Sequence, residues 1–463
     1  MPSFLTMFAS INRSLNTVLW GPPMLLILAS AGAFMALRTK GFAYRHFPFV
    51  LKNTFGKVFE KDATGHGQVS PFQALTTALA AGVGTANIVG VGSAIMMGGP
   101  GAIFWMWMAA LVGMSTKFSE VTLSVAYRDI DEHGNVRGGP MYYLTKGLKS
   151  PWLGKLFAVF GAFATFGIGC TVQSNSIANS VYEVFHVPHL VTGLIVGVIA
   201  FVGLIGGIKR IGQVTERLVP FMSIIYITGG IVVIFLHRHN LLPALASIFQ
   251  HAFHLKAVGG GLTGYTIVMA MRAGVSRGFF SNEAGMGSSP IAHAAATTDH
   301  PARQGLWGVF EVFVDTIVIC SLTSLVVLTT GIWQTHDNPA SLVAMSFGEG
   351  FFIGPYIVTA GLVLFALSTV LGWSYYGERC AQYLGGDKFS RFYLYVYVVL
   401  VVIGAIADLD LVWLVADNLN GLMAIPNLIG VIGLSGVTVR LLRDFLSDPK
   451  RIRESAEWQQ YLR

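Results

Sequence analysis

Long apolar stretches separated by short polar segments dominate the pattern of this sequence. A helix needs roughly 20 apolar residues to cross the hydrocarbon core of a membrane. We expect eleven membrane spans, at residues 15–37, 70–97, 101–127, 152–182, 188–208, 218–237, 262–297, 303–330, 351–377, 389–407 and 409–441. The pattern therefore predicts an all-α polytopic membrane protein.

Two further segments have the pattern of helices that lie on a membrane surface. Residues 41–68 interleave aromatic with basic side chains, which is typical of an interfacial amphipathic helix. The segment "LLPALASIFQHAFHLK", at 241–256, has a similar character and precedes the seventh expected span.

The composition agrees with a chain that is surrounded mostly by lipid. Of its 463 residues 53% are hydrophobic and 11% charged, and the mean hydropathy is +0.62, whereas soluble domains carry about 25% charged residues. The net charge of +7 would suggest nucleic acid as a partner of a soluble protein. Here the basic residues gather in alternate loops, so we expect no nucleic-acid partner.

The basic residues predict how the chain is oriented in its membrane. Loops on the cytoplasmic side of a membrane carry an excess of Lys and Arg. The loops expected on the other side hold only Arg13, Arg238 and Lys256. This bias places the N-terminus outside and the C-terminus in the cytoplasm, which requires an odd number of spans. We expect a bacterial plasma (inner) membrane.

The spans after the first fall into two halves of opposite orientation. Five spans begin at residue 70 from the cytoplasmic side, and five begin at residue 262 from the outside, as in the inverted repeats of many secondary transporters. The expected divisions are an N-terminal span with an interfacial helix (1–69), a first five-helix repeat (70–237), an outer amphipathic loop (238–261), a second five-helix repeat (262–441) and a cytoplasmic tail (442–463).

The first span of each half contains a run that weakens a helix. These runs are Gly82-Val83-Gly84-Thr85-Ala86-Asn87 and Ser281-Asn282-Glu283-Ala284-Gly285-Met286-Gly287. A broken helix in lipid leaves backbone groups that must be paired by protein, water or ligand. Its N–H end attracts an anion and its carbonyl end attracts a cation, so a carboxylate beside Na⁺ would satisfy both. The alternative is that the glycines only permit close helix packing; the paired breaks favour a binding site.

Other polar residues inside the spans allow two interpretations each. Gln173 can bind a substrate or join helices. Ser368 and Thr369 lie one turn before Trp373, and their hydroxyls suit Na⁺ while the indole walls an apolar pocket; simple packing is the alternative. The i,i+3 spacing of Lys117 and Glu120 predicts an ion pair.

Several other functions lack support in the sequence. There is no phosphate-binding Walker loop, zinc-protease motif or nucleophile elbow, so we expect no enzyme and no cofactor beyond a transported ion. The spacing of His237, His239, His251 and His254 could bind a metal, but a solvated loop is the stronger interpretation because no acidic or Cys ligand joins them. Coupling to protons through Glu283 and, much less favoured, an ion channel remain alternatives.

Three segments resemble one known family. "AAGVGTANIVGVGSAIMMGGPGAIFWMW", "RGFFSNEAGMGSSPIAHAAA" and "STVLGWSYYGE" resemble the alanine/glycine:cation symporter family, the sodium:alanine symporters of bacteria and archaea. The likeness extends from about residue 60 to residue 440. It implies a leucine-transporter-like fold with one additional N-terminal span, and a small amino acid, alanine or glycine, carried inward with Na⁺.

The resemblance also implies roles for individual residues. In the first break, the amides of Gly84 and Thr85 would take the substrate carboxylate, with Asn87 in the same binding set. Gln173 would contact the amino or carboxylate end of the substrate. The side-chain pocket would be bounded by Phe280, Thr369 and Trp373. The sodium site would consist of the hydroxyls of Ser368 and Thr369 and carbonyls near Ala78, Ala81 and Phe365.

Overall fold

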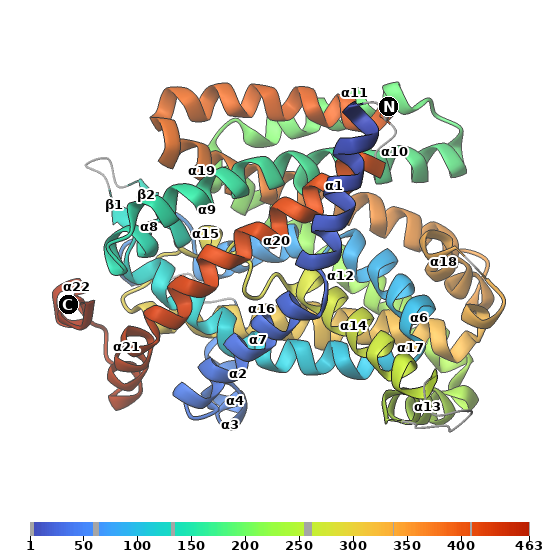
Figure 1. The fold of residues 1–463 in the computed structure, drawn as a ribbon, viewed down its shortest axis with the longest axis horizontal. Helices are drawn as coiled ribbons and strands as arrows, with labels where there is room; N and C mark the ends of the chain where they lie inside the picture. The colour runs from blue at the N-terminus through green and yellow to red at the C-terminus, as the bar shows by residue number, and fades with distance from the viewer. Residues whose placement is uncertain are drawn as a thin grey trace.

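The protein is almost entirely helical (Figure 1). The computed structural model describes residues 4–58, 64–130, 135–253, 262–336, 338–407 and 410–462. Within these ranges the β-structure is one small antiparallel sheet, in which β1 (Asp129–Ile130) pairs with β2 (Val136–Arg137), and two isolated bridges.

The helices are numbered in chain order. Those before residue 240 are α1 (Phe4–Leu19), α2 (Pro22–Arg38), α3 (Phe42–Arg45), α4 (Phe47–Asn53), α5 (Pro71–Gly82), α6 (Val91–Gly98), α7 (Gly101–Ala126), α8 (Pro140–Tyr142), α9 (Pro151–Ala164), α10 (Val172–Phe185), α11 (His189–Leu204) and α12 (Gly207–Leu236). Those after it are α13 (Leu241–Phe253), α14 (Leu262–Asn282), α15 (Pro290–His293), α16 (Pro301–Val312), α17 (Ser321–Thr330), α18 (Pro339–Gly350), α19 (Gly354–Ile406), α20 (Asp410–Gly433), α21 (Ser435–Ser447) and α22 (Ser455–Gln459).

Tighter or wider turns complete the helical structure. Turns of π-helix lie at Ala86–Gly90, Tyr143–Gly147, Thr165–Thr171 and Phe313–Cys320. Short 3₁₀ turns lie at Phe55–Lys57, Arg238–Asn240, Ile332–Gln334 and Gln460–Leu462.

Several helices are long and apolar enough to cross a membrane, which confirms a polytopic membrane protein. Within the described residues they are Met7–Arg38, Pro151–Phe185, Gly207–Leu236, Pro301–Thr330, Gly354–Ile406 and Leu414–Gly433, with the bent pair Pro71–Gly82 and Ala86–Gly98 as a seventh. The 53 residues of α19 contain two of the expected spans, because the backbone turns at Gly386 with φ 74°. The total of eleven stays a prediction.

Some expected span boundaries are wrong. Between α1 and α2 the helix stops at Gly21, since Pro22 and Pro23 follow and proline lacks the N–H of a helix interior. At the other end of the chain, the expected span 409–441 is divided, because α20 ends at Gly433 and α21 starts at Ser435. The helix expected at 218–237 begins earlier, at Gly207.

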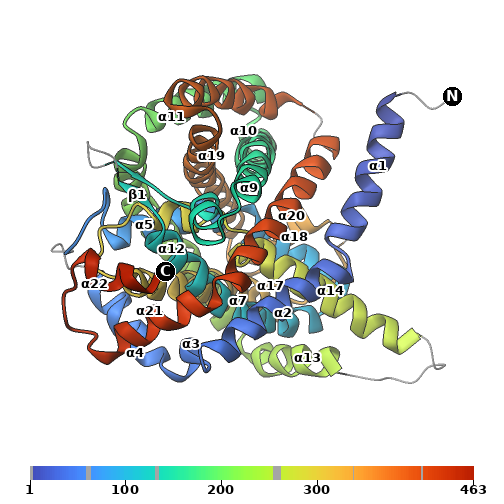
Figure 2. The same ribbon diagram turned by 60° about the vertical axis from the view of Figure 1, so that its left-hand side comes forward.

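Helix α5 lies between two groups of packed helices. In one group α7 packs against α14 and α16, and in the other α19 packs against α10 and α11 (Figures 1 and 2). Helix α5 contacts both α16 and α19, and also α12. The contact between α7 and α14 is close: a Cβ added at Gly274 would lie 2.0 Å from the Ala102 carbonyl oxygen. Such approaches are typical of helix packing in lipid.

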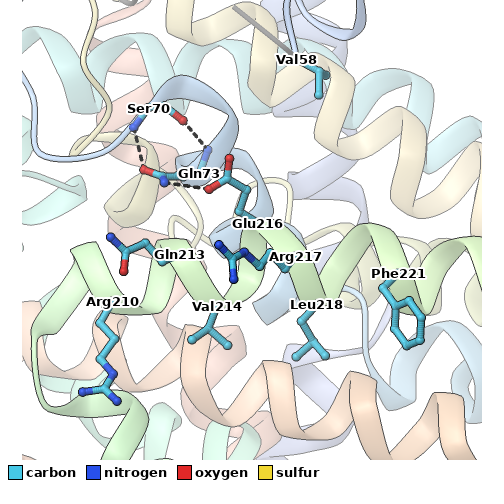
Figure 3. A pocket seen from close by; sticks show the side chains of 10 residues that line it. All are labelled: Val58, Ser70, Gln73, Arg210, Gln213, Val214, Glu216, Arg217, Leu218 and Phe221. Carbon is cyan, nitrogen blue, oxygen red and sulfur yellow. Dashed lines mark hydrogen bonds between the residues drawn. The ribbon is translucent and has the colours of Figure 1, made fainter. Parts of the chain in front are cut away.

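Helix α5 is fixed at its start by a polar chain (Figure 3). Ser70 and Gln73 form a capping box, in which the Ser70 hydroxyl accepts from the Gln73 N–H at 3.0 Å and the Gln73 side chain accepts from the Ser70 N–H. The Gln73 amide then donates to Glu216 of α12 at 2.8 Å. These three residues line a cavity of about 1220 Å³. Their hydrogen bonds hold the first half of the broken span against α12.

The second break is confirmed, but the helix does not resume as a span. After Asn282 only the short α15 follows, so the expected helix to residue 297 is wrong. Neighbouring segments supply the missing hydrogen bonds. Val69 accepts from the N–H of Thr297 at 2.8 Å, and the Arg128 guanidinium donates to the carbonyls of Ala294 and Ala296 at 2.8 and 2.7 Å.

The C-terminal segment packs against the loop that precedes α16. The indole of Trp458 donates to the Asp299 carbonyl at 2.9 Å, and the Arg453 N–H donates to the Asp299 carboxylate at 3.2 Å. His300 lies beneath this contact, where its Nδ1 accepts the N–H of Ala302 at 3.1 Å and its Nε2 faces Asp444 at 3.2 Å.

The tail contact should weaken in mild acid because His300 is held neutral. Burial first, and then the charge of Arg453, lower the pKa of His300, while Asp444 and Asp299 oppose that shift. A pKa below the unfolded value of about 6.5 gives stability that is full above that pH and is lost as the pH falls. We expect hydrogen exchange in residues 435–462, corrected for its intrinsic pH dependence, to be faster at pH 5.5 than at pH 7.5.

A matched variant separates His300 from other acid effects. In His300→Asn the side-chain oxygen can still cap α16, but no group titrates there. The pH dependence of exchange in the tail should therefore largely disappear. An unchanged pH dependence in the variant would contradict this assignment.

Candidate functional site

The first broken span bends where the sequence predicts it. Helix α5 ends at Gly82, Val83 is extended, and the second half runs from Ala86 to Gly98 at 56° to the first. Neither Gly82 nor Gly84 has a positive φ, so the break does not need glycine for its backbone angles. Gly84 is needed for a close approach, because a Cβ there would lie 2.8 Å from Thr369 Oγ1.

Four oxygen atoms converge where α5 ends against α19. The Ser368 hydroxyl donates to the Ala80 carbonyl at 3.2 Å and to the Phe365 carbonyl at 2.8 Å. The Thr369 hydroxyl donates to the same two carbonyls at 3.0 and 2.9 Å. Oxygen ligands of this kind suit a hard cation. The α5 carbonyl in this group belongs to Ala80, whereas Ala78 and Ala81 were expected.

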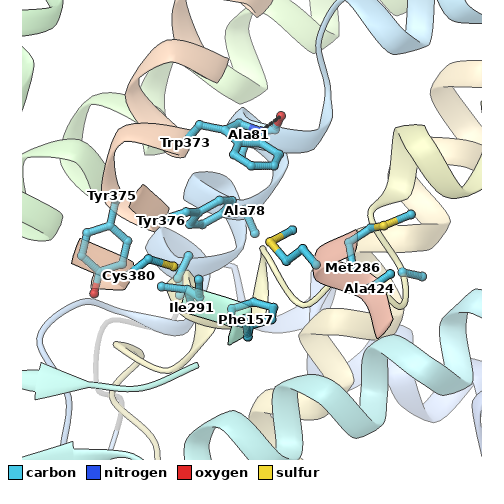
Figure 4. Packing of buried hydrophobic residues seen from close by; sticks show 14 of the residues in the cluster. Ala78, Ala81, Phe157, Met286, Ile291, Trp373, Tyr375, Tyr376, Cys380 and Ala424 are labelled. Atoms are coloured by element: carbon cyan, nitrogen blue, oxygen red, sulfur yellow. Dashed lines mark hydrogen bonds between the residues drawn. The ribbon is translucent and has the colours of Figure 1, made fainter. Parts of the chain in front are cut away.

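One of the carbonyls that were expected to bind the ion, that of Ala81, accepts a hydrogen bond from Trp373 instead. Its indole N–H donates to the Ala81 oxygen at 3.2 Å, and the ring packs edge-on against Tyr376 with the centroids 5.5 Å apart (Figure 4). The side chain is only 2% exposed. Gly169 of the neighbouring helix permits this position, since a Cβ there would lie 2.4 Å from that of Trp373.

The break, α14 and α19 enclose a small cavity. Its volume of about 20 Å³ has room for a water molecule rather than an amino acid. It is lined by Ala81, Gly82, Gly84, Thr85, Ala86, Ile168, Gln173, Phe280, Glu283, Thr369, Trp373 and Asn420. A vestibule of about 720 Å³ shares three of these residues, Thr85, Ala86 and Phe280. The structure thus brings six of the seven expected substrate residues to one cavity, Asn87 being the exception.

Asn87 instead links the two breaks behind the cavity. Its side-chain oxygen accepts the Gly84 N–H at 2.9 Å, so this amide already has a partner. Its amide group donates to Asp315 at 2.7 Å and to the Ser281 hydroxyl at 3.0 Å. The Ser281 hydroxyl also donates to Asp315 at 2.7 Å. All four residues are buried, so this network ties the first break to the second.

The ends of the broken helices place partial charges of opposite sign next to the cavity. The N-terminal end of the second half-helix, at Thr85 and Ala86, presents the positive end of its dipole. Helix α14 ends with its negative end at Asn282, and Glu283 follows with the unusual φ of 53°. A left-handed residue other than glycine is strained, and such strain gathers at functional sites. One side of the cavity therefore suits an anion and the other a cation.

The expected pair between Lys117 and Glu120 is wrong. Lys117 donates to Ser289 at 2.6 Å and lies 3.4 Å from Glu311, while Glu120 accepts from Asn427. One partner of Lys117, Ser289, lies in the turn before α15 and the other, Glu311, lies on α16, and sequence spacing on α7 alone indicates neither.

Three contributors to the site were not predicted. Asp315 had a usable signal, because an ionisable residue inside an apolar span is a functional candidate. Asn420 had a weaker signal, as an uncharged polar residue inside an expected span. The carbonyl of Ala80 had no side-chain signal. The histidine loop gains no support as a metal site: among the described residues no three His, Cys, Asp or Glu side chains are grouped to hold a metal ion, and His254 lies outside them.

Comparisons with known proteins show which sequences and which fold this chain resembles. The sodium/alanine symporter AgcS of Methanococcus maripaludis is 49% identical, with 95% of this chain and 97% of that protein covered. The probable sodium/glutamine symporter GlnT of Bacillus subtilis is 36% identical, over 97% and 93% of the two chains. The solved structure of a Na⁺-coupled sialic acid symporter in a substrate-bound outward-open state has a TM-score of 0.55 at 12% identity, over 96% of each chain, so the fold is shared.

The profile of one family covers nearly the whole sequence. It matches residues 5–459 and describes the sodium:alanine symporters, which are transporters and not enzymes. The chain belongs to the sodium:alanine symporter family.

Proposed function

We propose that this sodium-coupled amino-acid symporter imports alanine or glycine by alternating access, with the substrate at the first break. Its family and its relatives support amino acid and Na⁺ as the transported pair. The observation that carries the proposal is the small cavity, because its opposite sides suit an anion and a cation while four further oxygens lie next to it.

The two charges of the zwitterion match the ends of the broken helices at this cavity, which must widen to hold the substrate. Its carboxylate would lie at the positive end of the half-helix, near Thr85 and Gly84. Since the Gly84 N–H donates to Asn87, the carboxylate must share or displace that bond. Thr369 and Trp373 would limit the length of the side chain, which favours alanine and glycine. Phe280, which lines both cavity and vestibule, must move to admit the substrate.

Na⁺ would bind at the oxygens of Ser368, Thr369, Ala80 and Phe365. Ion contacts would replace the present hydrogen bonds from the two hydroxyls to the two carbonyls. Such an ion would clamp the end of α5 against α19 and would thereby fix the break. Ion and substrate then bind to one shared element, which is the physical basis for coupling them.

The vestibule supplies the route to the site. It is lined by residues that the charge bias of the loops places on the outer side, among them Asn179, Asn338 and Asp417. We infer an outward-facing arrangement in a leucine-transporter-like inverted repeat, with the N-terminus outside and the C-terminus in the cytoplasm of a bacterium. The cytoplasmic contacts of α5 with α12 and of the tail with the loop before α16 would have to open for release.

A proton-coupled symporter is the second candidate. Glu283 borders the cavity, and its carboxylate accepts a hydrogen bond from Ser288. A protonatable group at the substrate would favour this alternative. The neutral oxygens around Ser368 and Thr369 favour Na⁺.

Purified protein in liposomes should accumulate alanine only when Na⁺ is present with an inward electrochemical gradient. A membrane potential of about 100 mV yields about 2.3 kcal/mol per charge, and a tenfold gradient adds about 1.4 kcal/mol. One Na⁺ could thus support an accumulation on the order of 500-fold. Equal uptake of labelled alanine in choline and sodium buffers would contradict sodium coupling, and uptake driven by a pH gradient alone would favour the proton alternative.

Two neighbouring glycines provide a matched test of the binding site. Gly84→Ala places a methyl group 2.8 Å from Thr369 Oγ1, whereas Gly82→Ala meets only the Ser281 carbonyl at 3.3 Å. We expect Gly84→Ala to lower the affinity for alanine by about tenfold or more, which corresponds to about 1.4 kcal/mol. Gly82→Ala should lower it much less. Equilibrium binding to monodisperse protein in detergent measures both, and equal affinities for both variants would contradict this location of the site.

A further inference from the structure

Two of the residues that line the small cavity, Gln173 and Asn420, each have a buried amide oxygen that lacks a partner. Gln173 donates its amide N–H to the Ile168 carbonyl at 3.0 Å, so its other atom, Oε1, is directed elsewhere. Neither Gln173 Oε1 nor Asn420 Oδ1 has a hydrogen-bond partner among the described residues. The two side chains are 4% and 2% exposed. Buried acceptors of this kind are costly unless a ligand or water pairs with them.

The same wall contains an acidic side chain and no basic one. Glu283 lines the cavity, and no Lys or Arg is among its described lining residues. A group that pairs with both Gln173 and Asn420 must donate at least two hydrogen bonds, and Glu283 nearby favours a donor with positive charge. A primary ammonium has three N–H donors and no acceptor, so it matches this wall.

We propose that Asn420 is a specificity-determining residue that, together with Gln173, receives the ammonium group of the substrate through its side-chain oxygen. This assignment rests on the proposed function, and it resolves which end of the substrate meets Gln173. The carboxylate then lies toward Thr85, at the N-terminal end of the second half-helix. Glu283 supplies the negative charge near the ammonium.

This arrangement selects for an unsubstituted α-amino group. With acceptors at Asn420, Gln173 and Glu283, each ammonium N–H can have its own partner. An N-methyl group would replace one N–H and leave one acceptor unpaired. A hydroxyl in place of the ammonium, as in lactate, would remove the positive charge and all but one donor. The protein should thus bind alanine far better than N-methylalanine or lactate.

The test measures how strongly each variant discriminates between these ligands. Alanine, N-methylalanine and lactate are titrated against purified protein in detergent with saturating Na⁺, and binding is followed by calorimetry. Asn420→Leu keeps a similar size but removes the acceptor. We expect its affinity for alanine to fall at least tenfold, and the preference for alanine over N-methylalanine to fall at least fivefold.

Two further variants distinguish recognition from packing. Asn420→Asp keeps the shape and the acceptor, so it should retain the preference for alanine even if Asn420→Leu does not fold. Asn418→Leu is the matched control, because Asn418 is equally buried and its oxygen also lacks a partner. It is not among the lining residues of the cavity, and it donates to Asn12 of α1 at 2.9 Å. It should leave the ratio of the affinities within about twofold.

The outcomes separate this proposal from the proposed function. The proposal is overturned if Asn420→Leu weakens the binding of alanine and of N-methylalanine equally. It is also overturned if Asn420→Asp loses the preference for alanine, because Asn420 would then not recognise the ammonium group. If the unaltered protein binds no amino acid, the proposed function fails first. Loss of the preference in Asn418→Leu would also contradict the proposal, since a distant packing change would then suffice.

Discussion

The end of α5 imposes the constraint on which the rest of the structure depends. A helix that stops inside the hydrocarbon region exposes carbonyl groups that lipid cannot pair. Here the hydroxyls of Ser368 and Thr369 pair with the Ala80 carbonyl, and the indole of Trp373 pairs with that of Ala81. Helix α19 therefore supplies the hydrogen-bond donors that the last carbonyls of α5 lack within their own helix. Any group that binds at this junction must replace those bonds, and so it must change how the two helices contact each other.

A second set of bonds ties the break to its counterpart. Asn87 accepts from the Gly84 N–H and donates to Ser281 and Asp315, so the second half of the first broken span is joined to α14 and to the helix that contains Asp315. The small cavity lies between these two junctions. A ligand there contacts α14, α19 and both sides of the first break. This geometry makes the cavity a place where small ligands can influence the packing of whole helices.

The sequence predicted the breaks well because helix breakers in a long apolar stretch are a local signal. It also predicted most residues of the cavity, through their motifs. The partners of Lys117, the Ala80 carbonyl and the role of Asn87 were not accessible. They depend on which helices meet, and on backbone atoms that every residue possesses. The failure of the helix to resume after the second break was missed for a similar reason: residues 294–299 stay non-helical because a distant loop and Arg128 satisfy their backbone.

Binding linkage between Na⁺ and alanine tests the central claim, that an ion clamps α5 to α19 and so forms the substrate site. Two ligands that share this element must strengthen each other by the same factor. Calorimetry on purified protein can measure the affinity for alanine across a range of Na⁺ concentrations, and the affinity for Na⁺ with and without alanine. The account predicts equal coupling factors above tenfold in the unaltered protein, and factors near one in Thr369→Val. Strong coupling that survives in Thr369→Val, or an alanine affinity independent of Na⁺ in the unaltered protein, would contradict it.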